Sequence, residues 1–169
     1  HILGGRVDES RVTSGGDMPI LVRLAAAHGI DSFDTHNSPD VEARSSAGSV
    51  NLSVFGPQRL FIDAALDVHT GGWIGGLTEL VAGRDIILPG FDANLLRATA
   101  GRDFILNGEV LAGALRVNAG RDVSLLAGTG VQTWLEGSGG NMTLKNAAML
   151  GSVETIRGLS LTAGNDVLV

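Results

Sequence analysis

The feature that most constrains this chain is a four-residue motif that returns at a nearly constant interval. Ala-Gly-Arg-Asp stands at residues 82–85, 100–103 and 119–122, and Ala-Gly-Asn-Asp stands at residues 163–166. Weaker copies occupy residues 14–17, 46–49, 64–67 and 138–141. Counted from their second residue, successive copies are 32, 18, 18, 18, 19, 19 and 25 residues apart. Such a regular period indicates a repeat protein, in which each copy builds one structural unit.

Apolar and polar residues alternate on both sides of the motif. The position three residues after the second motif residue is apolar in all eight copies: Met18, Val50, Val68, Ile86, Phe104, Val123, Met142 and Val167. Two residues further on, seven of the eight copies are again apolar, and Thr70 is the exception. A second alternating pair precedes the motif, as at Leu115 and Val117, although Arg44 and Glu136 break that column. A period of two predicts strands with one buried face.

A unit of this length is too short to hold a strand and a crossover helix, but it suits one coil of a β-solenoid. A single coil cannot bury its own apolar face, so coils stack and equivalent residues form ladders along the axis. Parallel crossovers are right-handed in about 98% of cases. The sequence therefore predicts an all-β fold, a right-handed parallel β-helix with roughly 18–19 residues per coil.

The repeat is not equally regular along the chain. Residues 46–169 are expected to form regular coils, with an insertion near residues 145–158. Residues 1–45 are expected to form irregular coils, in which residues 23–40 leave the coil as a loop or a helix. Both ends look like cuts through a longer solenoid, so Val167 and Val169 are expected at an open core that favours end-to-end association.

The copies at residues 82–88, 100–106 and 119–125 share the pattern A-G-R-D-(V/I/F)-x-L. At its nearly constant spacing, this pattern resembles the filamentous haemagglutinin-like family of large exoproteins of two-partner secretion. The resemblance implies a β-helical shaft that an outer-membrane secretion partner exports to the bacterial cell surface. It also implies a part in virulence and cell adhesion, with a host-cell glycan or protein receptor as a possible ligand.

Composition excludes several function classes. The net charge is −6 and no basic run occurs, which argues against binding nucleic acid. The chain has no cysteine, so disulfides and Cys-type zinc sites are excluded. No apolar run is long enough to predict a membrane span. No nucleophile elbow, P-loop or H-E-x-x-H motif occurs, and we expect no enzyme activity and no cofactor.

An acidic or amide residue closes most copies of the motif: Asp17, Asp67, Asp85, Asp103, Asp122, Asn141 and Asp166. Calcium-binding roll repeats need G-G-x-G-x-D on a nine-residue period, and this chain has neither the spacing nor the extra glycines. We therefore expect a structural ladder in which each side chain caps its own turn by accepting a backbone N–H. Arg84, Arg102 and Arg121 precede three of these aspartates and should form an outer charge ladder that flanking aspartates can pair with. An anion-binding stripe is the alternative.

Two other groups of residues are candidate sites. His28, Asp31, Asp34 and His36 are metal-ligand types in one short segment, but their spacing matches no motif, so a polar loop is expected instead and no metal site. Trp134 falls in the inward column and should pack in the core. Trp73, in T-G-G-W-I-G-G, is the better carbohydrate-contact candidate because it lies in a glycine-rich turn.

Three functions remain in view. The first is a shaft segment of a secreted bacterial surface adhesin that attaches to host or other cells. The second is the stick of a contact-dependent toxin-delivery exoprotein, which differs only in a toxin domain outside this sequence. The third is a polysaccharide-active β-helix enzyme, which the pattern disfavours because the carboxylates recur at one turn position instead of collecting in one cleft.

Overall fold

The computed structural model describes residues 2–8, 11–13, 21–36, 40–108, 110–125, 129–144, 148–149 and 158–168, and side chains for most of them. Every regular element in this part of the chain is a β-strand. The strands are β1 (Ile2–Asp8), β2 (Arg11–Thr13), β3 (Val22–His36), β4 (Asp40–Ser45), β5 (Ser49–Phe55), β6 (Arg59–Ala64), β7 (Val68–Ala82), β8 (Ile86–Leu88), β9 (Phe91–Ala100), β10 (Phe104–Leu106), β11 (Val110–Ala119), β12 (Asp122–Leu125), β13 (Thr129–Gly139), β14 (Asn141–Leu144), β15 (Ala148–Met149), β16 (Gly158–Ala163) and β17 (Val167–Leu168).

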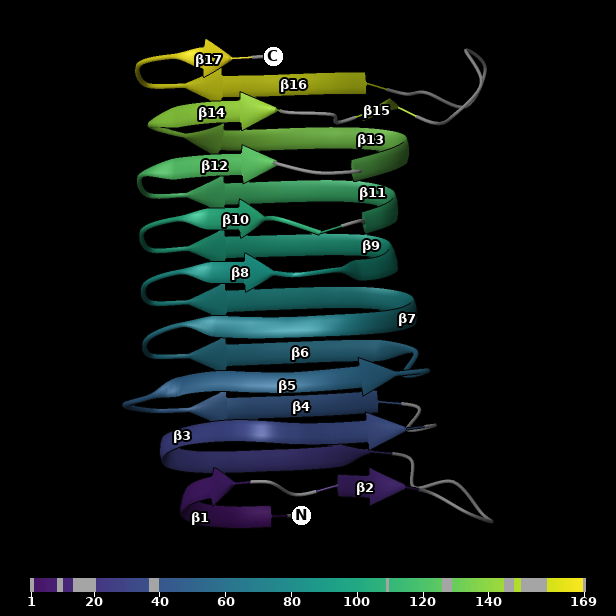
Figure 1. Ribbon diagram of the computed structural model, residues 1–169, viewed down its shortest axis with the longest axis vertical. Coiled ribbons are helices and arrows are strands. Elements are labelled where there is room, and N and C mark those ends of the chain that lie inside the picture. The colour runs from purple at the N-terminus through teal and green to yellow at the C-terminus, as the bar shows by residue number, and fades with distance from the viewer. Residues whose placement is uncertain are drawn as a thin grey trace.

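The strands stack in parallel, one coil above another, with the chain ends at opposite ends of the stack (Figure 1). One column of strands contains β4, β6, the second half of β7, β9, β11, β13 and β16. The facing column contains β5, the first half of β7, β8, β10, β12, β14 and β17. The predicted all-β parallel β-helix is confirmed.

The register reproduces the sequence period. Ile86 pairs with Phe104, and Phe104 pairs with Val123, so residues at the same position of successive motif copies are neighbours between coils. All three side chains are at most 1% exposed, as is Val68 one coil earlier. The apolar column after the motif therefore points inward and forms a continuous ladder in the core.

The turn glycines stack as the motif predicts. Gly101 donates its N–H to the carbonyl of Ala82 at 2.9 Å, and Gly120 donates to Ala100 at 3.0 Å. A Cβ at Gly101 or Gly120 would collide with the carbonyl oxygen of the glycine one coil earlier. Glycine is therefore required here because two backbones approach closely.

The expectation that residues 23–40 leave the coil as a loop or a helix is wrong for residues 23–36. This stretch forms β3 and not a loop or a helix, pairing with β4 from Val22 to Ala26 and with β5 from Gly29 to His36. The motif is lost at this level, but the alternation that buries Leu24 and Ile30 is kept. The core pattern is thus enough to hold a coil whose turn departs from the repeat.

Two turns differ in length by one residue, and this explains both exceptions in the second apolar column. Residues 46–49 fill a turn that residues 65–67 fill in the next coil, so Arg44 pairs with Asp63 on the outer face. In a later coil the turn is one residue shorter: residues 139–140 form the turn that residues 119–121 form one coil earlier. Glu136 is therefore in register with Arg116. The sequence alignment holds the turn length constant and therefore misplaces both residues by one position.

The shorter turn also changes the position predicted for Trp134. Its backbone pairs with Ala114, while Leu135 pairs with the fully buried Leu115. Trp134 therefore does not belong to the inward column, and its side chain lies outside the described part.

The coil before β16 holds additional residues. Ala112, Val131 and Met149 are in register, as are Ala114, Trp134 and Gly158. One residue separates these positions in β11, two separate them in β13, and residues 150–157 separate them in the last coil. The insertion expected near residues 145–158 falls largely on residues 145–147 and 150–157, which lie outside the described residues.

The expected open core at the C-terminal end falls on residues of which little is described. The backbone of Val167 pairs with Met142, which places β17 directly on β14. The side chain of Val167 and the whole of Val169 lie outside the described residues, so end-to-end association stays a prediction.

Candidate functional site

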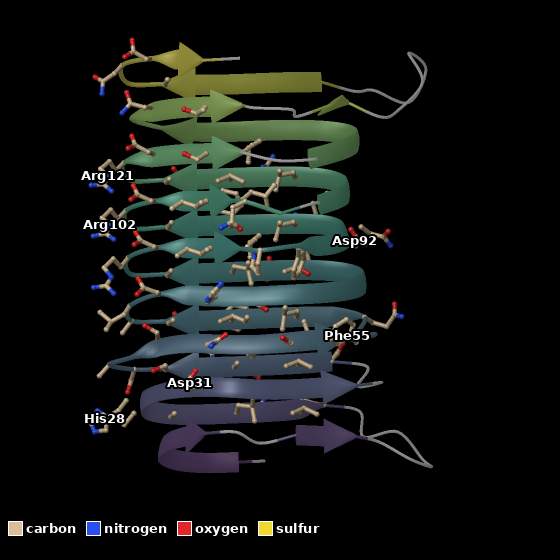
Figure 2. All side chains as sticks on the ribbon, viewed as in Figure 1. His28, Asp31, Phe55, Asp92, Arg102 and Arg121 are labelled. Atoms are coloured by element: carbon tan, nitrogen blue, oxygen red, sulfur yellow. The ribbon has the colours of Figure 1, made fainter. Side chains whose placement is uncertain are left out.

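Arginines and aspartates of successive turns join the coils along one edge of the solenoid (Figure 2). Arg84 Nε donates to Asp67 Oδ1, Arg102 Nε to Asp85 Oδ1, and Arg121 Nε to Asp103 Oδ1, each at 2.7 Å. In every pair the second guanidinium nitrogen donates to Oδ2 of the same carboxylate. Each arginine therefore forms a bidentate ion pair with the aspartate of the preceding coil, the geometry that makes such pairs strong.

The same carboxylates also hold the backbone of the following coil. Oδ1 of Asp67 accepts the N–H of Asp85 at 3.2 Å, Oδ1 of Asp85 accepts that of Asp103 at 3.2 Å, and Oδ1 of Asp103 accepts that of Asp122 at 3.3 Å. The expectation that each aspartate caps its own turn is therefore wrong for these three. The bond goes to the next coil because equivalent turns stack directly above one another.

Uncharged residues lie at both ends of this ladder. At its start, Ser49 Oγ accepts the N–H of Asp67 at 3.2 Å. At its end, Asp122 Oδ1 accepts the N–H of Asn141 at 3.1 Å and its side-chain Nδ2 at 2.7 Å. Gly140 lies directly before Asn141, where the three preceding coils have Arg84, Arg102 and Arg121. Asp166 is exposed, and Asp17 lies outside the described residues.

Hydrogen bonding within the pairs shifts the pKa values of Asp67, Asp103 and the three arginines. The Arg84 guanidinium lowers the pKa of Asp67, and the Arg121 guanidinium lowers the pKa of Asp103, despite partial burial that acts in the opposite direction. The pKa of each of the three arginines is raised, chiefly by hydrogen bonding to the carboxylate. The carboxylates of Asp67 and Asp103 are thus held ionised and bonded to the following coil, which suits fastening of coils and not acid–base chemistry.

The predicted polar cluster does not assemble a metal site in the described part. No three His, Cys, Asp or Glu side chains converge there. His28 is exposed, and Asp31 accepts a hydrogen bond from Asn51 Nδ2 at 3.0 Å. The side chains of Asp34 and His36 lie outside the described residues. All four residues belong to β3, so the loop expected here is a strand.

The carbohydrate candidate Trp73 is placed only through its backbone. It pairs with Phe55 on one side and Asp92 on the other, and its own side chain is not among those described. Phe55 is exposed, and Figure 2 shows it on the same edge of the solenoid as Asp92.

A second charged surface escaped the sequence analysis. On the outer face of β3, β4, β7 and β9, Glu42 accepts hydrogen bonds from Arg23 and Arg44 at 2.8 Å each, and Arg97 contacts Glu79 at 3.3 Å. The signal was available, because opposite charges occupy neighbouring coils at the position between the two inward residues. The one-residue misalignment at Arg44 in the sequence alignment hid this pattern.

Comparison with known proteins found no matching family model, no matching curated protein and no matching solved structure. In the described residues, no helix has the length and apolar character needed to cross a membrane.

Proposed function

We propose that this chain is a shaft segment of a secreted bacterial surface protein, whose role is to extend and to hold other parts of that protein away from the cell. The observation that carries the proposal is the coil-to-coil ladder. One unit, an aspartate gripped by the arginine and the backbone N–H of the following coil, is used at Asp67, Asp85 and Asp103. A repeated fastening along the axis serves mechanical continuity, and it leaves these groups unavailable to a substrate.

The interior supports the same role. The described core is one continuous apolar cluster from Val22 to Leu125, built mainly of Leu, Ile, Val and Ala. In a stack of this kind each coil contacts only its neighbours, so stability grows with each coil added. This property suits a shaft, because coils can be added or removed without a change of fold.

Location and export are part of the proposal and rest on the repeat's resemblance to two-partner secretion exoproteins. The test uses the bacterium that encodes the chain. Antibodies raised against residues 46–125 should label intact cells, and external protease should remove the signal while a periplasmic marker is spared. Deleting the gene for the outer-membrane partner should abolish labelling. Labelling that requires cell lysis would contradict the proposal.

A further inference from the structure

A hollow of about 310 Å³ lies on the outer face of the sheet formed by β4, β6 and the second half of β7. It spans three coils, and its solvent-facing lining includes Asp40, Glu42, Arg59, Phe61, Leu77 and Glu79. The hollow lies on the flat outer face of a sheet, away from the turn ladder, and none of the Asp–Arg pairs of that ladder lines it.

The lining comes from two neighbouring outward columns. In the first, Glu42, Phe61, Glu79 and Arg97 follow one another coil by coil, so a single aromatic ring interrupts a run of charges. The guanidinium of Arg44 lies 4.8 Å from the centre of the Phe61 ring and holds it in place. In the second column, Asp40, Arg59 and Leu77 are in register.

In the part of the chain that the structure describes, some charged side chains of the hollow form ion pairs and others do not. Glu42 is bonded by Arg23 and Arg44, and Glu79 is paired with Arg97. Asp40 and Arg59 form no ion pair within the described residues, although they are register neighbours of opposite charge. The hollow therefore offers the Asp40 carboxylate as a hydrogen-bond acceptor and the Arg59 guanidinium as a donor, beside the Phe61 ring and Leu77.

We propose that this hollow binds a neutral oligosaccharide. A sugar hydroxyl can donate to the Asp40 carboxylate while another accepts from the Arg59 guanidinium, and the C–H face of the ring can pack against Phe61 and Leu77. An ionic ligand would satisfy only one of the two open charges and leave the other desolvated without a partner. A protein partner is disfavoured because binding hot spots need a deep apolar pocket for an anchor side chain, and half of the residues that line this hollow are charged.

Small binding sites are concave surfaces in which a few polar groups orient the ligand, and this arrangement has that form. Binding here goes beyond the shaft role and does not depend on it. A chain that fails to bind sugars but appears on the cell surface would overturn only this inference.

The test is an array of immobilised neutral and acidic oligosaccharides probed with the full chain, followed by titration calorimetry with the best neutral binder. Asp40→Asn and Arg59→Ala should each weaken binding by about tenfold or more, because each removes a hydrogen bond to a charged group. Phe61→Ala should weaken it as well. Thr99→Ala, an exposed position of β9 outside the hollow, is the matched control and should bind as the unaltered chain does.

Circular dichroism and thermal melting establish that each variant is folded. Asp40→Asn changes no volume, so it tests the site even if Phe61→Ala fails to fold. Absence of binding to every neutral oligosaccharide would overturn the proposal. Binding confined to acidic sugars, or binding that Asp40→Asn and Arg59→Ala leave unchanged, would overturn it too.

Discussion

At the scale of single residues, the turn glycines set how closely two coils can approach. A Cβ at Gly101 would collide with the backbone carbonyl of Gly83, whereas a Cβ at Gly164 would have its nearest heavy atom 3.7 Å away. Gly101→Ala should therefore lower the free energy of unfolding by about 1–3 kcal/mol, as overpacking of a tight site does. Urea denaturation of the two variants measures the difference. Gly164→Ala is the control, and equal losses would show that close approach is not what requires glycine.

Two buried threonines are the polar exceptions inside the core. The hydroxyls of Thr70 and Thr78 have no hydrogen-bond partner among the described residues, and both side chains are at most 1% exposed. Their register neighbours one coil away are leucines, such as Leu52 and Leu60. A buried hydroxyl without a partner costs about 1–3 kcal/mol, and replacing it with a methyl group of similar shape removes that cost.

Thr70→Val should consequently raise the melting temperature, and the Thr70→Val/Thr78→Val double variant should raise it further. Thr99→Val, which changes an exposed threonine of β9, should alter the free energy of unfolding by no more than about 0.5 kcal/mol. Differential scanning calorimetry provides the comparison. A lower melting temperature for Thr70→Val would mean that its hydroxyl is satisfied, for instance by an internal water.

At the scale of elements, the turn ladder makes stability depend on pH. In the folded chain the pKa values of Asp67 and Asp103 are lowered by their arginines, whereas the pKa of an aspartate in the unfolded chain is about 3.9. The ladder's contribution is therefore complete above that pH and is lost as pH falls through the lowered values. The free energy of unfolding should stay level between about pH 5 and 7 and decline below about pH 4.

Asp103→Asn separates the ladder from other acidic groups. Its side chain keeps its size but loses the charge that pairs with Arg121, so stability at pH 7 should drop and the acid decline should become shallower. Asp166→Asn, at an exposed member of the same column, should change neither. Denaturant titrations at several pH values measure both slopes, and identical profiles for the two variants would contradict the ladder's role.

At the scale of the whole molecule, a solenoid should tolerate loss of one complete coil. Deleting residues 101–119 joins Ala100 to Gly120, which brings β12 onto β8 and β13 onto β9 in the register that β10 and β11 provide. Arg121 then meets Asp85 in place of Arg102. The shortened chain should fold and melt cooperatively with an unchanged strand signal, because each coil interacts only with its neighbours.

Deleting residues 101–110 is the matched control. It removes about half a coil, so inward and outward positions no longer match between neighbouring coils. Circular dichroism should show loss of the ordered strands in this variant alone. If both deletions fold equally well, the coils are not the units of stability.

Much of the fold follows from the sequence alone, because burial in a solenoid is decided by a short period. The alternation around Ile86, Phe104 and Val123 predicts parallel strands and their inward faces, since only stacked coils can cover such a face. The close glycine column follows from the same period. These properties repeat along one dimension, and the spacing along the chain is enough to read them.

Only the tertiary structure decided which groups meet between coils. Arg121 donates its hydrogen bonds to Asp103 of the preceding coil, while the adjacent Asp122 lies 3.7 Å from its Nε, because consecutive turns stack directly above one another. That preference depends on the exact stacking of two coils. One-residue changes in turn length moved Arg44, Glu136 and Trp134 by one position, and these are local backbone adjustments without a signal in the period. The hollow around Asp40, Arg59 and Phe61 arises in the same way, since it is assembled from three coils whose side chains come together only after register is set.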